Sequence, residues 1–251
     1  AALALDAAWT ELVAAFGAWR CMDNLAHAKG DVAGSIAAVR EPHFWVLACL
    51  YIGTFGSFIG FSGVFPKLIV DTFPEYSTFT VGAAALSLAF LGPLVGSIAR
   101  PWGGRLADRM GGARMTVGSF AAMAVLALLV VLTLPLRNFW LFLALFLALF
   151  VAAGIGNGAT YRMIPSIYRL RGRGRGGVVS AERRSAAALG LISAVGAYGG
   201  FAIPQVLSAA HQNTGSYAAA FGGFVAFYLL AMVLCWACYL RRGSQLAAHK
   251  V

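Results

Sequence analysis

The sequence predicts an all-α integral membrane protein, built as a bundle of six transmembrane helices. Hydrophobic residues make up 60% of the 251 residues and charged residues only 11%, which lies outside the range of soluble globular domains. The apolar residues are also gathered into six runs of 21 to 26 residues, each free of charged side chains. About 20 residues suffice for a helix to cross the hydrocarbon core of a bilayer, where a helix satisfies its own backbone polar groups.

The segment that precedes the first run, residues 1–43, is of a different kind. Ala1–Trp19 is apolar but carries Asp6 and Glu11, so it is either the remnant of a membrane span or a surface helix. Residues 20–43 are polar and indicate a connecting segment. Because the chain begins with alanine and lacks the basic region of a signal peptide, we expect it to be a fragment of a longer protein.

The six runs form one predicted unit, residues 44–242, and residues 243–251 form a short tail. In chain order the runs are Phe44–Pro66, Phe79–Ala99, Thr116–Leu136, Asn138–Tyr161, Ser185–Ala210 and Tyr217–Leu240. None of them alternates with the period of two that a membrane-spanning strand requires. Each run is therefore expected to be a helix.

The basic residues predict the orientation of this unit in the membrane. Of the 19 lysines and arginines, 16 lie before the first run, in the loops after the second and fourth runs, or in the tail. Only Lys67 and Arg137 lie on the other side, and Arg100 remains inside an apolar region. Since basic residues accumulate on the cytoplasmic side, both ends of the unit are expected to be cytoplasmic. Their dispersal between apolar runs argues against a nucleic-acid partner and for a lipid bilayer.

Arg100 is the most informative single residue. It lies about nine residues, roughly 13 Å along a helix, from Asp108 and Arg109. These two residues belong to the charged segment Gly104–Gly111, which is expected to be the loop joining the second and third spans. An arginine at membrane depth costs about 2.5–3.5 kcal/mol on insertion scales. Two interpretations stay open: Arg100 binds an anion, or its side chain extends to the cytoplasmic surface.

Two other features accompany Arg100. Tyr51 and Phe55 are four residues apart, so they share one helix face and could form the wall of a pocket, although ordinary packing explains them as well. The fifth run contains the cluster Gly196, Gly199 and Gly200. Since glycine weakens a helix, this concentration exceeds what packing alone requires.

The sequence excludes several classes of site. The four histidines are scattered outside the runs and form no metal-binding pattern, and no catalytic constellation is present, so neither an enzyme nor a cofactor is expected. No acidic residue lies within any of the six runs, which argues against a carboxylate proton relay there.

The segment Gly104–Gly111, with the sequence GRLADRMG, resembles the loop motif of the major facilitator superfamily. This resemblance implies that Gly104, Asp108 and Arg109 form a conformational latch between neighbouring helices. The sequence departs from the motif after Gly111, where Gly112 and Ala113 replace the usual basic pair, which implies a weaker latch.

Three separated stretches resemble the nitrate/nitrite porters of that superfamily, the NarK type. They are 50–62 (LYIGTFGSFIGFS), 92–100 (GPLVGSIAR) and 188–204 (ALGLISAVGAYGGFAIP). The resemblance implies the C-terminal half of a twelve-span major facilitator fold in a bacterial-type inner membrane, with a partner N-terminal half. It also implies nitrate or nitrite as the transported anion. The implied substrate-binding residues are Arg100, Tyr51, Phe55, Gly196, Gly199 and Gly200.

Overall fold

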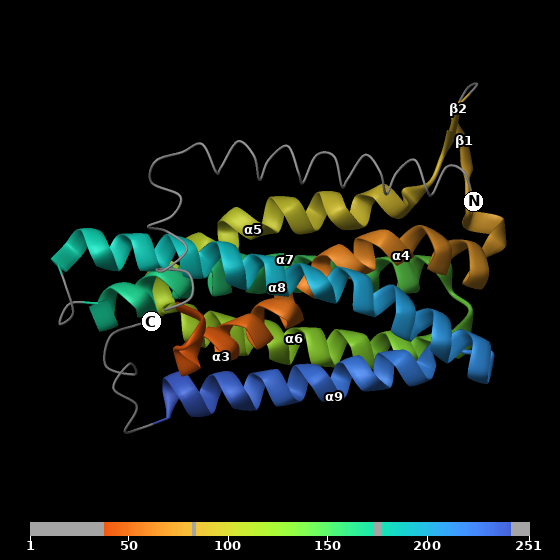
Figure 1. The fold of residues 1–251 in the computed structure, drawn as a ribbon. Coiled ribbons are helices and arrows are strands. Elements are labelled where there is room, and N and C mark those ends of the chain that lie inside the picture. The colour runs from red at the N-terminus through yellow and green to blue at the C-terminus, as the bar shows by residue number, and fades with distance from the viewer. Residues whose placement is uncertain (1–37, 82–83, 173–176, 242–251) are drawn as a thin grey trace, which may run out of the picture.

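The computed structural model describes residues 38–81, 84–172 and 177–241. The expectations for most of the segment 1–43, including Asp6 and Glu11, and for the tail 243–251 lie outside these residues. Within the described part the chain forms a bundle of six long helical rods, which confirms the predicted all-α class (Figure 1). The rods are α3–η1–α4 (Pro42–Tyr51, Ile52–Gly56, Ser57–Thr72), α5 (Leu91–Met110), α6 (Gly112–Thr133), α7 (Phe139–Gly172), α8 (Gly177–Thr214) and α9–η5 (Ala218–Cys235, Trp236–Leu240).

Five of these rods are long and apolar enough to cross a membrane by their length and composition, within the part of the chain that is described. They are Pro42–Thr72, Gly112–Leu136, Phe139–Leu170, Arg184–Thr214 and Ala218–Leu240. The remaining rod, α5, falls short of this criterion because its 20 residues include four charged side chains: Arg100, Arg105, Asp108 and Arg109.

Two predicted boundaries around α5 are wrong. The run that begins at Phe79 does not start as a helix: β1 (Phe79–Val81) and β2 (Ala84–Leu86) pair as an antiparallel hairpin, and α5 begins only at Leu91. An apolar run alone does not distinguish a strand from a helix, so hydropathy could not locate this boundary.

The expected loop at Gly104–Gly111 is also wrong, since α5 continues to Met110. The turn into α6 consists of Gly111 alone, whose φ of 95° favours glycine.

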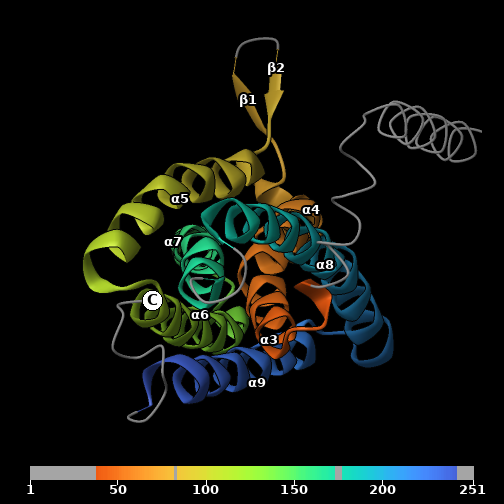
Figure 2. The same ribbon diagram turned by 60° about the vertical axis from the view of Figure 1, so that its left-hand side comes forward.

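Helix α7 is the central element of the bundle. It lies against α5, α6 and α8 and against the π-helical turn η1 (Figure 2). Towards α4 it contributes stacked phenylalanines: the rings of Phe65 and Phe146 are 4.6 Å apart, and Phe61 meets Phe146 edge to face at 5.6 Å. These three side chains are almost completely buried, so aromatic packing fixes α4 on α7.

The contact between α5 and α7 depends on small residues. A Cβ atom at Gly158 would lie 2.1 Å from the carbonyl oxygen of Arg100 and 2.8 Å from the backbone nitrogen of Gly104. Likewise, a Cβ atom at Gly103 would lie 2.2 Å from the carbonyl oxygen of Ile155. The two backbones therefore approach as closely as helices do at small-residue interfaces in membranes, and this approach positions Arg100.

Replacing Gly158 by alanine should separate these helices. We expect Gly158→Ala to lower the melting temperature of the purified protein, because the added methyl group meets backbone atoms that cannot move aside and such overpacking costs about 1–3 kcal/mol. Gly118→Ala is the matched control, since nothing lies within 4 Å of its Cβ position and alanine favours a helix. Equal melting temperatures for the two variants would contradict the proposed contact.

Candidate functional site

The first wall of the candidate site is the point where α3 passes into α4. Here the helix widens into a single π-helical turn, Ile52–Gly56. Tyr51 lies immediately before this turn and Phe55 lies within it, and their ring centroids are 5.1 Å apart. The sequence predicted that the two rings share a face but not the π-helical turn, a feature that is frequent at functional sites.

Arg100 extends from α5 to this aromatic pair. Its guanidinium carbon lies 5.5 Å from the centroid of the Phe55 ring, which is a cation–π distance. The hydroxyl group of Tyr51, whose side chain is buried, interacts with Arg100 and with Ser193 of α8. Neither of the ion pairs found among the described residues involves Arg100. The result is a half-buried cation beside two aromatic rings, for which the described residues supply no carboxylate partner.

The glycine cluster of α8 forms the other side of this site, but its members differ in what they contact. A Cβ atom at Gly196 would lie 2.5 Å from the ring of Tyr51, so Gly196 faces the site. At Gly199 it would lie 2.6 Å from the Cα atom of Gly56, and at Gly200 2.6 Å from the side chain of Ile59. Gly199 and Gly200 thus hold α8 against the first rod, beside the ring of Tyr51 rather than against Arg100.

A separate apolar cavity of about 190 Å³ lies between α8, α9 and the first rod. Its lining residues are Ile52, Ser57, Gly199, Ala202, Ile203, Val206, Phe224, Phe227 and Tyr228. Arg100, Tyr51 and Phe55 are not among them. This cavity therefore does not belong to the site around Arg100.

The expected latch residues lie at the end of α5. Asp108 forms a bidentate ion pair with Arg162 of α7: Nε donates to Oδ1 at 2.9 Å and Nη2 to Oδ2 at 2.6 Å. Gly104 faces the same partner, because its Cβ position lies 3.7 Å from Cγ of Arg162. Arg109 is exposed and takes no part in an ion pair among the described residues.

Of this ion pair the sequence singled out Asp108 but not its partner Arg162. Consecutive residues point about 100° apart on a helix, so Arg109 does not face α7 when Asp108 does. Arg162 was counted only as a basic residue of a loop. The extension of α7 to Gly172 makes it a helical residue that faces α5.

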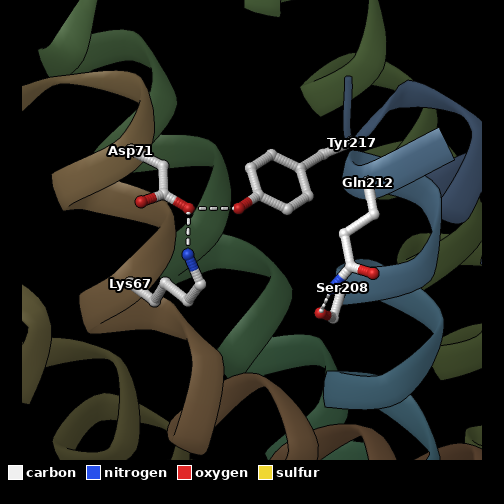
Figure 3. A network of polar contacts seen from close by, with 5 residues as sticks. All are labelled: Lys67, Asp71, Ser208, Gln212 and Tyr217. Atoms are coloured by element: carbon white, nitrogen blue, oxygen red, sulfur yellow. Dashed lines mark hydrogen bonds and ion pairs between the residues drawn. The ribbon is translucent and has the colours of Figure 1, made fainter. Parts of the chain in front are cut away.

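A second polar cluster lies at the opposite end of the bundle, where α4 and α8 end (Figure 3). Lys67 and Asp71 form an ion pair at 2.5 Å, and the hydroxyl group of Tyr217 donates a hydrogen bond to the same carboxylate oxygen. Tyr217 also stacks on His211 at 4.5 Å. Burial, the hydrogen bond to Asp71 and the negative charge of that carboxylate raise the pKa of Tyr217, so the phenol stays protonated and continues to donate. Asp71 thereby ties the end of α4 to the start of α9.

Metal binding finds no support in the part of the chain that is described, which contains no cluster of three or more histidine, cysteine or acidic side chains able to hold an ion.

Comparison with known proteins assigns the chain to a family. The sequence profile of the major facilitator superfamily matches residues 26–181. The chain is 40% identical over 248 residues to the nitrate/nitrite transporter NarU of Escherichia coli (strain K12), covering 93% of this chain and 52% of that protein. It is 38% identical over 209 residues to the probable nitrate/nitrite antiporter NarK2 of Thermus thermophilus, covering 82% of this chain and 44% of the relative.

A more distant relative is the nitrite extrusion protein of Bacillus subtilis (strain 168), at 30% identity over 207 residues, 82% of this chain and 47% of that protein. The chain thus spans about half the length of the curated relatives it matches. With its apolar helices it is a multi-pass membrane protein. The chain belongs to the major facilitator superfamily, within its NarK-type branch.

Proposed function

We propose that this chain is the C-terminal half of a carrier that moves nitrate and nitrite across a membrane by alternating access. The observation that carries the proposal is Arg100, a cation held between Tyr51 and Phe55 without a carboxylate partner among the described residues. A charge in such a place is costly unless it is paired. A small anion is the partner that would complete the site, and the relatives in the comparison are named for nitrate and nitrite.

The chemistry of the site suits a planar oxyanion. The guanidinium group offers several N–H donors in a rigid plane and keeps its charge at any physiological pH. Nitrate and nitrite are planar and present oxygen acceptors to such a fork. The rings of Tyr51 and Phe55 shield the charge from water, and Gly196 lets α8 approach the ring of Tyr51 closely. These groups bind and orient an ion and perform no covalent chemistry, so we propose a carrier rather than an enzyme.

The remaining parts of the proposal follow from the architecture of such carriers. Their substrate lies near the bilayer midplane between two halves, and one half moves against the other. Arg100, Tyr51, Phe55 and Gly196 would form one wall, with Gly199 and Gly200 supporting it, and an N-terminal half would supply the other wall. We place the carrier in the plasma membrane, as the resemblance to the NarK type implies, and the distribution of basic residues supports an orientation with both ends of the unit cytoplasmic.

A competition experiment tests the choice of anion. The purified carrier, this chain together with an N-terminal half of the family, is titrated with nitrate, nitrite, chloride and formate. We expect nitrate and nitrite to displace each other, and chloride to bind at least about tenfold more weakly because a spherical ion uses the planar donor fork less well. Formate is a planar carboxylate that also fits the fork, so its affinity relative to nitrate separates a nitrate/nitrite site from a general site for planar oxyanions. Tighter binding of formate or chloride would instead favour a carrier for another small anion.

The ion pair between Asp108 and Arg162 is proposed to be the latch of the transport cycle. Its side chains are about half exposed, at 49% and 55%, so it should contribute little to folding stability. We expect Asp108→Asn to slow nitrate flux severalfold while the dissociation constant for nitrate changes by less than about twofold, because an ion pair that differs between conformations biases their populations without touching the substrate.

Arg109→Ala is the matched control for this latch. It removes a neighbouring exposed charge that has no ion pair in the described part of the chain, and should leave flux unchanged. The latch assignment fails if Asp108→Asn transports at the rate of the unaltered carrier, or if Arg109→Ala slows transport as much.

A further inference from the structure

Asn157 is the least explained polar side chain in the described part of the bundle. It lies in α7 with 0% of its surface exposed, yet neither Nδ2 nor Oδ1 has a hydrogen-bond partner there. Buried side-chain amides are normally hydrogen-bonded, because leaving such a group unsatisfied is costly. A side chain with both of its polar atoms unpaired therefore calls for a partner that the protein itself does not supply.

Two polar residues near Asn157 have hydrogen-bond partners of their own. Thr160 of α7 donates to the carbonyl oxygen of Gly156 at 2.8 Å and lies 3.4 Å from the hydroxyl group of Thr116 on α6. Thr54 of the π-helical turn donates to the carbonyl oxygen of Leu50 at 3.2 Å. Each of these two hydroxyl groups has its own acceptor. The buried hydroxyl group of Ser119 on α6, beside Gly156, also has no partner among the described residues, and it is not hydrogen-bonded to Asn157. A leucine would fill the same space without unpaired atoms.

The position of Asn157 points to the candidate site. Its two neighbours are glycines that contact the site from α7: the Cβ position of Gly158 meets the backbone of Arg100, and that of Gly156 lies 2.9 Å from Cγ2 of Thr54, between Tyr51 and Phe55. Asn157 is also one helical turn from Tyr161, so the two side chains share a face. Asn157 therefore lies at the level where the backbone of Arg100 passes α7, between a residue that meets α5 and a residue that meets the π-helical turn.

We propose that Asn157 is a further anion-binding residue, whose amide N–H group donates a hydrogen bond to an oxygen of the bound oxyanion. The inference rests on the proposed function. In the occupied site Arg100 supplies the charge and Asn157 a neutral, directional donor. Its Oδ1 atom can in turn accept from the guanidinium or from the hydroxyl group of Tyr51. Because chloride has no oxygen acceptors in a plane, such a donor favours oxyanions over chloride, as buried polar groups do in other selective sites.

The test compares Asn157→Leu with the unaltered carrier, again with an N-terminal half present. We expect the dissociation constant for nitrate to rise by about tenfold or more, and the preference for nitrate over chloride to fall, because one hydrogen bond to a charged ligand is lost. The melting temperature without anion should stay equal or rise, since two unpaired polar atoms have been removed from the core. A merely structural asparagine would show the opposite: a lower melting temperature and unchanged affinity.

Two further variants make the test decisive. Asn157→Asp keeps the shape but replaces the donor by a carboxylate oxygen, and should weaken nitrate binding even more. Thr160→Val, one turn away and within a satisfied network, should lower the melting temperature and leave nitrate affinity within about twofold.

Nitrate binding equal to that of the unaltered carrier in both Asn157 variants would overturn the inference, and so would failure of both to fold. If the unaltered carrier itself does not bind nitrate, it is the proposed function that fails.

Discussion

Replacing Arg100 by lysine is expected to raise the dissociation constant for nitrate by about tenfold to a hundredfold, although the charge is retained. Lysine carries a point charge on a flexible stem and cannot present two coplanar donors, so at least one charged hydrogen bond of about 1.5–3 kcal/mol is lost. The contact of the guanidinium plane with Phe55, at 5.5 Å, is lost as well. Titration of the purified carrier with nitrate measures the change.

Arg105→Lys provides the matched control for this variant. Arg105 lies on the same helix, is exposed and also lies over an aromatic ring, with its guanidinium carbon 5.6 Å from the Trp102 ring. Its replacement should leave nitrate affinity unchanged, because it lies more than a helical turn from Arg100 and its guanidinium lies over Trp102 rather than Phe55. Near-normal affinity in Arg100→Lys would refute the assignment of Arg100 to the anion. A loss in both variants would point to a general electrostatic effect.

The second large effect concerns the chain by itself. We expect it to insert into liposomes and to carry no nitrate until an N-terminal half is co-expressed. In carriers of this architecture the substrate site lies between two halves that move against each other, and this chain would supply one wall. Without a partner the face that carries Arg100 would meet lipid, which is unfavourable, so the isolated chain should also self-associate.

Nitrate uptake is measured for the chain alone and for the chain co-expressed with the second half. Sedimentation in detergent measures the self-association of the isolated chain. Saturable uptake by the chain alone would mean that it is a complete transporter. If the isolated chain is monomeric and stable, the expectation that the face carrying Arg100 is left exposed without the second half is wrong.

The fold could largely be predicted from the sequence because hydropathy depends only on composition along the chain. Runs such as Thr116–Leu136 coincide closely with helices, since in a bilayer an apolar run of this length has few alternatives to a helix. The prediction was wrong at two places where the bilayer does not by itself impose a helix or a loop. At Phe79 apolar residues form a hairpin, and past Gly104 a charged segment continues as a helix because it packs on Gly158 and Arg162 of α7. Tertiary contacts of this kind cannot be read from one segment.

The candidate site was predictable only in part. Arg100 stands out because a charge inside an apolar run is costly, and Tyr51 and Phe55 because four residues bring two rings to one face. Arg162 and Asn157 gave no such signal: Arg162 is the first basic residue after an apolar run, and Asn157 is one of two asparagines within that run. Their roles depend on which helix they face. The close approach of α5 and α7 determines which helix each of these side chains faces, and residue spacing along the chain cannot predict that approach.

The most direct test of the proposed function is nitrate flux into liposomes that contain this chain together with an N-terminal half. Uptake is followed with nitrite, chloride or formate added as competitors, and with Arg100→Lys in parallel. We expect saturable nitrate uptake that nitrite inhibits, that chloride inhibits at least about tenfold more weakly than nitrite, and that Arg100→Lys largely abolishes. Uptake that does not saturate, or that survives in Arg100→Lys with the same half-saturating concentration, would contradict it.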